Sequence, residues 1–170
     1  MSIKANSKKN KDYTLPILFG VFAVLLIVMI TALCIPKTPE FVPPAFEAAA
    51  MAGVPEVPES LGYIAPYQEG MGYRFSVCGN VVMEGNAAAV YLTNPEENDV
   101  WLKLRVLDEN DTILGETGLI RPGEYVKDVA LTENLPTGTK IMLKIMGYEP
   151  ETYFSAGSAT LNTAIGDVAQ

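Results

Sequence analysis

The sequence predicts an all-β domain, a single immunoglobulin- or fibronectin-like β-sandwich of about seven strands, preceded by an N-terminal transmembrane helix. Apolar and polar residues alternate with a period of two through most of residues 73–170. Turn signals recur there about every ten residues, which is typical of sandwich domains. One long apolar run precedes this region, in residues 15–35.

The apolar run, LPILFGVFAVLLIVMITALCI, contains no charged residue. As a helix rising about 1.5 Å per residue it would extend about 30 Å, the thickness of a bilayer's hydrocarbon core. It is also longer than the apolar region of about 7–15 residues in a cleaved signal peptide. The run therefore predicts a permanent signal-anchor helix over residues 15–35.

The charges that flank this run predict its orientation. Lys4, Lys8, Lys9 and Lys11 precede it, whereas only Lys37 lies close behind it. Because positively charged flanks stay in the cytoplasm, residues 1–14 are expected to form a basic cytoplasmic tail. The predicted localisation is the plasma membrane, single-pass, with the C-terminal domain outside the cytoplasm.

Residues 36–72 differ in composition from the rest of the chain and are predicted to form a proline-rich, acidic spacer. Prolines at this density disfavour helix interiors and sheet ladders, so an extended, semi-rigid segment is expected. The extracytoplasmic β-sandwich is then assigned to residues 73–170. The prolines of the spacer are Pro36, Pro39, Pro43, Pro44, Pro55, Pro58 and Pro66.

The segment VWLKLRVLD gives the clearest strand and the only candidate site. Its alternation places Leu102, Leu104 and Val106 on an inner face, with Trp101, Lys103 and Arg105 on the outer face. An outward Trp beside basic residues is typical of a protein-contact surface, so this triplet is the candidate contact face. The alternative is that Trp101 packs beneath a neighbouring loop. In the later segment KIMLKIMGYE, Ile141, Leu143 and Ile145 are expected to face inward.

The residue inventory gives no support to an enzyme. The chain contains no histidine, the commonest general base and zinc ligand, and no phosphate-binding glycine loop. No catalytic residue, cofactor or metal is therefore predicted. The acidic cluster Asp108–Asp111 lacks the glycine and distal glutamate of a calcium loop and is interpreted as a solvated turn.

Charge and cysteine content restrict the partners further. The formal net charge is -8, and an acidic chain is poorly suited to neutralising phosphates, so no nucleic-acid partner is expected. Of the two cysteines, Cys34 and Cys78, the second falls in a strand segment. It is predicted to be a small buried apolar residue, since a disulfide between the two positions is not expected.

The segments TNPEEN, VWLKLRVLDEN, ILGETGLIRPGEYV and LKIMGYEPETYFSAGSATLNT resemble small membrane-anchored or exported sandwich proteins of Gram-positive Firmicutes. The resemblance covers about residues 90–165 and rests on the turns at Asn94-Pro95 and Pro122-Gly123 and on the segment Gly118-Leu119-Ile120. It implies a bacterial cell-envelope protein with a β-sandwich. It transfers no catalytic or binding residue, because this family is largely uncharacterised.

Together these features predict a non-catalytic interaction or structural module, anchored in the cell envelope and displayed outside the membrane, with a protein as its partner. The alternative is a small accessory subunit of a multiprotein membrane machine, such as a secretion or conjugation apparatus. In that case the N-terminal helix would pack against other subunits rather than act as a tether.

Overall fold

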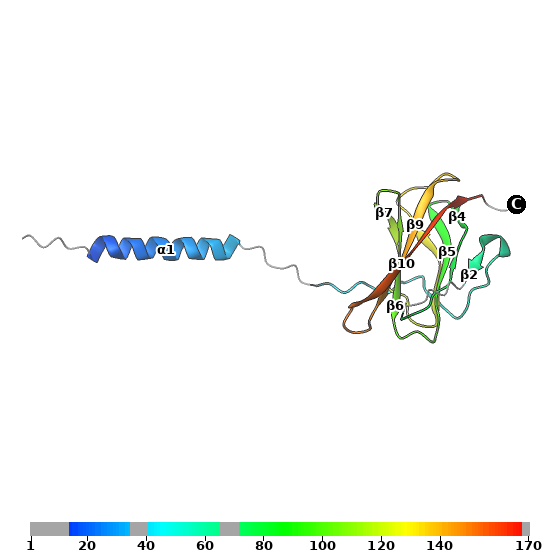
Figure 1. Cartoon of the computed structure of the whole chain (residues 1–170), viewed down its shortest axis with the longest axis horizontal. Coiled ribbons are helices and arrows are strands. Elements are labelled where there is room, and N and C mark those ends of the chain that lie inside the picture. Colours follow the sequence, from blue (N-terminus) through cyan, green and yellow to red (C-terminus); the bar gives the residue numbers. More distant parts are fainter. Residues whose placement is uncertain (1–13, 35–40, 65–71, 168–170) are drawn as a thin grey trace, which may run out of the picture. The chain divides into compact units, whose positions relative to one another are not determined.

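A computed structural model describes residues 14–34, 41–64 and 72–167 of the chain (Figure 1). The chain divides into two compact units, Met1–Val42 and Pro43–Gln170. Of the predicted basic tail, residues 1–13 lie outside the described residues. The first unit contains a helix, and the second contains the strands.

Helix α1 spans Thr14–Cys34 in the first unit, so the helical part of the N-terminal prediction is confirmed. Apolar side chains cover the helix on all sides, because the run contains no polar stripe that would define a solvent-facing face. Its large apolar side chains are exposed, as for Leu15 at 68% and Phe19 at 70%.

The prediction that this helix spans a membrane is overturned. Among the residues that the structure describes, no helix is both long enough and apolar enough to cross a bilayer. The transmembrane assignment of residues 15–35 and the single-pass plasma-membrane localisation are corrected accordingly.

The second unit is built from strands, which confirms the mostly-β prediction. Eight strands form one sheet in the order β1-β8-β5-β4-β10-β9-β6-β7, and β2 pairs with β3 beside it. A short 3-10 helix at Glu59–Leu61 precedes β2. The strands are β1 Met51–Ala52, β2 Tyr63–Ile64, β3 Val77–Cys78, β4 Val81–Glu84, β5 Ala87–Asn94, β6 Trp101–Leu107, β7 Ile113–Glu116, β8 Glu124–Ala130, β9 Lys140–Tyr148 and β10 Ser155–Gly166.

The large sheet curls, so that β7, at one end of the strand order, approaches β8 near the other end. The backbone N–H of Thr132, just after β8, donates to the carbonyl oxygen of Leu114 in β7 at 2.8 Å. Gly115 permits this approach, because a Cβ at that position would collide with the carbonyl oxygen of Ala130. The curling encloses a core between the two halves of the sheet.

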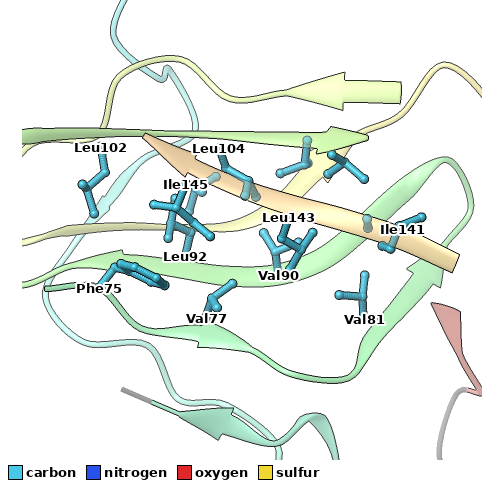
Figure 2. Packing of buried hydrophobic residues seen from close by; sticks show 14 of the residues in the cluster. Phe75, Val77, Val81, Val90, Leu92, Leu102, Leu104, Ile141, Leu143 and Ile145 are labelled. Atoms are coloured by element: carbon cyan, nitrogen blue, oxygen red, sulfur yellow. The ribbon is translucent and has the colours of Figure 1, made fainter. Parts of the chain in front are cut away.

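The core lies where inward side chains of β6 and β9 meet those of β3, β4 and β5 (Figure 2). Leu102, Leu104 and Val106 are all 0% exposed, which confirms the predicted inner face of β6. The inner residues predicted for β9 are confirmed as well: Ile141, Leu143 and Ile145 are at most 2% exposed. Alternation therefore located the core correctly in both strands.

The β-domain begins at Pro43, within the segment predicted to be a spacer. Phe46 forms a parallel bridge with Leu119, and β1 pairs antiparallel with β8. Further along, Leu61 packs in a second apolar cluster with Cys78 and Tyr91 on the outside of β5. Proline limits regular strand length here, but it does not prevent single bridges and two-residue strands.

Cys78 is 0% exposed within this second cluster, as predicted for a small buried apolar residue. Burial raises the pKa of its thiol to about 11. The thiol is therefore protonated at neutral pH, and a protonated, buried thiol is a poor nucleophile.

Candidate functional site

Trp101, the first residue of β6, lies outside the main core and is half-buried. Its ring packs edge-to-face against Phe46, with ring centroids 4.9 Å apart and planes at 78°. On another side the ring of Tyr153 lies 5.3 Å away, tilted by 58°. We call Phe46, Trp101 and Tyr153 the aromatic cluster. Such ring pairs add about 0.5–1.5 kcal/mol each beyond the area they bury.

The segment that carries Phe46 is fixed by backbone hydrogen bonds on both sides of the ring. The N–H of Leu119 donates to the carbonyl oxygen of Ala45 at 2.9 Å, and the N–H of Glu47 donates to the carbonyl oxygen of Leu119 at 2.8 Å. The carboxylate of Glu47 also accepts from the N–H of Gly118 at 2.7 Å. Gly118 has to be small, because a Cβ there would lie 2.6 Å from the backbone nitrogen of Glu47.

Arg121 adds a cation to the aromatic cluster. Its guanidinium carbon lies 3.6 Å from the centroid of the Phe46 ring, in a cation–π arrangement. The guanidinium also forms an ion pair with Glu124, at 3.5 Å. The cluster therefore combines aromatic surface with one positive charge on an otherwise acidic domain.

Tyr153 reaches Trp101 from the turn between β9 and β10. That turn contains two residues with positive φ, Glu151 at 64° and Tyr153 at 58°, a conformation that L-residues adopt rarely. The N–H of Tyr153 donates to the carbonyl oxygen of Glu149 at 3.0 Å and stabilises the turn. The next residue, Phe154, is 69% exposed, so the same turn also presents a solvent-facing ring.

Lys103 and Arg105 share the outer face of β6 with Trp101, as predicted, but they interact with a common counter-ion rather than with the cluster. Both reach Glu116 on β7: the Lys103 ammonium at 2.8 Å and the Arg105 Nε at 2.9 Å. Lys103 is only 7% exposed. Burial acts to raise the pKa of Glu116, but the hydrogen bonds and charges of the two bases outweigh it, so the net shift is downward.

The predicted triplet therefore separates into two parts. Trp101 belongs to the aromatic cluster, whereas Lys103 is largely enclosed in an ion-paired group with Arg105 and Glu116. Sequence analysis did not find Phe46, Arg121 or Tyr153. Each lies far from Trp101 in the chain. The bridges between Phe46 and Leu119 and between Leu102 and Ile120, with the pairing of Trp101 and Tyr148, bring these segments together.

The buried side chain of Asn94 fixes the backbone just before Trp101 and Arg121 by hydrogen bonds. Asn94 is 0% exposed, and its Nδ2 donates to the carbonyl oxygens of Val100 and Ile120, both at 2.9 Å. Its Oδ1 accepts from the side chain of Asn98 at 2.6 Å. The predicted Asn94-Pro95 turn therefore does more than reverse the chain, because it joins the segments that lead into Trp101 and Arg121.

The acidic loops contain no metal-binding geometry among the described residues, where no three His, Cys, Asp or Glu side chains are grouped to hold an ion. In the turn after β6, Asp108 Oδ1 accepts from the backbone N–H groups of Asn110 and Thr112, at 2.8 and 2.7 Å. The hydrogen bond from Thr112 is the main cause that lowers the pKa of Asp108. This carboxylate stabilises its own turn.

Comparisons of the chain with protein families, with characterised proteins and with solved structures find no match. The resemblance to Firmicutes sandwich proteins stays a prediction.

Proposed function

We propose that the domain Pro43–Gln170 is a non-catalytic module that binds a protein through the surface around the aromatic cluster. The observation that carries the proposal is the position of Trp101, which packs between Phe46 and Tyr153 at the surface rather than in the core. Binding hot spots are enriched in Trp, Tyr and Arg. The exposed ring of Phe154 enlarges the apolar area beside the cluster.

Charge supports a protein as the partner. Residues 43–170 carry 7 Lys and Arg against 18 Asp and Glu, a net charge of -11. Such a domain repels phosphate backbones. Arg121 is placed to meet a carboxylate or carbonyl group of a partner, since the ring of Phe46 orients its guanidinium.

The proposal includes the finer fold class predicted from the sequence, an immunoglobulin- or fibronectin-like sandwich. Two features support it: the enclosed core between two halves of the curled sheet, and β10, which pairs antiparallel with β9 and parallel with β4. Anchoring and display at a membrane form no part of the proposal, because the predicted anchor is overturned.

The proposal is tested by photo-crosslinking in the cells that produce the protein. A benzophenone amino acid replaces Phe154, next to the cluster, or Ile113, an exposed apolar residue of β7 that serves as the matched control. The expected result is one discrete protein adduct from position 154, absent from position 113 and at least tenfold weaker when Trp101→Ala is added. Equal adducts at both positions, or an adduct unaffected by Trp101→Ala, would rule the surface out.

The exposed apolar surface of helix α1 supports a second candidate function, in which the protein is an accessory subunit of a multiprotein assembly. Its apolar side chains are exposed along the described length, and a continuous apolar surface of this kind marks an interaction site. Deleting residues 1–40 should then release the β-domain from its assembly in native electrophoresis, whereas Trp101→Ala should not. The reverse pattern would favour the aromatic cluster as the sole contact.

A further inference from the structure

One long edge of β10 carries no strand partner. β10 pairs antiparallel with β9 from Ser155 to Ala164, and on its other side it pairs with β4 only at Ile165 and Gly166. Among the described residues, no strand pairs with that second edge between Ser158 and Asn162. These residues therefore offer backbone N–H and C=O groups for a further strand.

Two side-chain hydrogen bonds mark the ends of this open edge. The hydroxyl of Tyr73 donates to the carbonyl oxygen of Gly157 at 2.8 Å. The hydroxyl of Thr163 donates to the carbonyl oxygen of Gly79 at 2.7 Å. Both pairs are separated by 84 residues, the same offset as in the true parallel pair Val81 and Ile165. The segment leading into β4 thus runs alongside β10 in register, but its backbone pairs with β10 only at the far end.

The open edge lacks the features by which proteins normally protect edge strands. Native edges carry Lys, Pro or inward-pointing charges that discourage pairing with another chain. Residues 152–166 contain no charged residue and no proline, and they form the longest uncharged stretch of the β-domain. In a domain with net charge -11, this is the strip along which two copies approach with the least repulsion.

The side chains along the edge suit pairing with an identical strand. Ser158, Thr160 and Asn162 are exposed on the outer face. Two threonines placed opposite one another across two strands form a stabilising hydrogen-bonded pair, and a serine hydroxyl can hydrogen-bond an asparagine amide in the same way. On the inner face, Leu161 is only half-buried. It borders a cavity of about 130 Å³ lined by Val77, Cys78, Gly79, Leu143, Leu161, Asn162 and Thr163.

This cavity is smaller than the roughly 300–1,000 Å³ of small-molecule sites, and two residues of the open edge, Leu161 and Asn162, line it. We propose that residues 158–162 of β10 pair antiparallel with the same residues of a second copy, about a twofold axis at Thr160. Thr160 is the midpoint of the open edge. In that register Leu161 of one copy lies opposite Ala159 of the other. Leu161 of each copy then adds apolar surface over the 130 Å³ cavity of the other copy.

The test uses disulfide crosslinking of the full chain carrying Cys34→Ser; Cys78 stays, because it is buried. Thr160→Cys is compared with Thr132→Cys, an exposed threonine outside the strands. Mild oxidation should give at least tenfold more disulfide-linked dimer at position 160 than at 132. A mixture of Ser158→Cys and Asn162→Cys chains with different tags should give the mixed dimer in preference to either self-dimer. Circular dichroism and thermal melting check that each variant keeps the fold.

Equal crosslinking at positions 160 and 132 would overturn the proposal, and so would a preference for self-dimers at 158 or 162. Crosslinking of position 160 to a different protein without any self-dimer would also overturn it, since a heterologous strand would then occupy the edge. In a second measurement, Thr160→Lys should lower the dimer fraction in sedimentation at least fivefold, whereas Thr132→Lys should leave it unchanged. An unchanged dimer fraction in Thr160→Lys would count against pairing at this edge.

Discussion

The buried side-chain amide of Asn94 donates a hydrogen bond of 2.9 Å to the carbonyl oxygen of Ile120. The same nitrogen donates to the carbonyl oxygen of Val100 at 2.9 Å. Ile120 immediately precedes Arg121, and Val100 immediately precedes Trp101. One side chain therefore fixes the backbone positions from which the cation and the central ring of the aromatic cluster project.

Replacing Asn94 by Ala should lower the free energy of unfolding by about 1–3 kcal/mol, because the buried carbonyl oxygen of Val100 loses the hydrogen bond from Asn94. The carbonyl oxygen of Ile120 loses the same donor but keeps the N–H of Leu102. The measurement is urea denaturation followed by fluorescence of Trp101, the single tryptophan of the chain. The fluorescence emission of Trp101 in the folded variant should also shift, because the backbone before Trp101 loses its hydrogen bond to Asn94. Asn134→Ala, at an exposed loop position, is the control and should change stability by no more than about 0.5 kcal/mol. A loss at Asn94 as small as that of the control would contradict this role.

Much of the β-domain was predictable because burial of one face imposes a period of two on a strand. The segment predicted over residues 100–108 became β6, and the segment over 140–149 became β9. In both, the residues predicted to face inward are almost fully enclosed. The pattern was clear because each strand carries two basic residues at outward positions, Lys103 and Arg105 in β6 and Lys140 and Lys144 in β9.

Local sequence patterns could not predict that residues 43–64 pair and pack with the β-domain. Phe46 joins the domain through a single bridge to Leu119, and β1 and β2 each have two residues. Segments this short show no periodicity, and their prolines indicated a spacer instead. Their hydrogen-bond partners lie far along the chain, where composition gives no sign of pairing.

Only part of the surroundings of Trp101, Lys103 and Arg105 was predictable, for a related reason. Alternation placed Trp101, Lys103 and Arg105 correctly on the outer face of β6. It could not show that Glu116 lies beside the two bases, because this depends on the register between β6 and β7. An outward direction on a strand therefore does not by itself mean exposure, as the 7% exposed Lys103 shows.

The domain boundary at Pro43 leads to a prediction about truncation. The fragment 43–170 should unfold in one cooperative transition, since both apolar clusters lie within it. The fragment 73–170 should be less stable by about 3 kcal/mol or more, because it loses Leu61 and Phe46 from their packing sites. Both fragments are compared by urea denaturation. Equal stability would mean that residues 43–72 merely lie on the surface.

Asp128 on β8 is expected to destabilise the folded state at neutral pH. Its Oδ1 is buried and has no hydrogen-bond partner among the described residues, and Lys127 approaches its other oxygen only to 3.8 Å. Burial raises the pKa of Asp128 above its ordinary value of 3.8, and Lys127 offsets this only in part. Because the folded state holds the charge less readily than the unfolded state, the destabilisation develops as the pH rises above about 4.

Asp128→Asn should therefore raise the melting temperature at pH 7 by about 2 °C or more, and the gain should shrink toward pH 3, where the native carboxyl is protonated. Thermal melting by circular dichroism at both pH values gives the comparison. The exposed Asp99 supplies a control with the same change in net charge, and Asp99→Asn should have little effect. A gain that persists undiminished at pH 3 would show that packing, and not the charge, is responsible.

Trp101 and Leu104 lie on opposite faces of β6, so truncating them should have different consequences. Leu104 is 0% exposed in the core, and Leu104→Ala should cost about 2–5 kcal/mol of unfolding free energy. Trp101 contacts Phe46 and Tyr153 at the surface, so Trp101→Ala should cost less, about 1–3 kcal/mol for two ring contacts.

Urea denaturation followed by circular dichroism gives both values, because fluorescence is lost with Trp101. Phe154→Ala provides a third comparison: this ring is 69% exposed, so its removal should hardly change stability while it weakens binding of the partner. A loss at Trp101 of more than about 3 kcal/mol, equal to that at Leu104, would mean that Trp101 is primarily a packing residue. The partner-binding role would then rest on Phe154 and Arg121 alone, and Arg121→Ala should abolish the adduct from position 154 without lowering the stability.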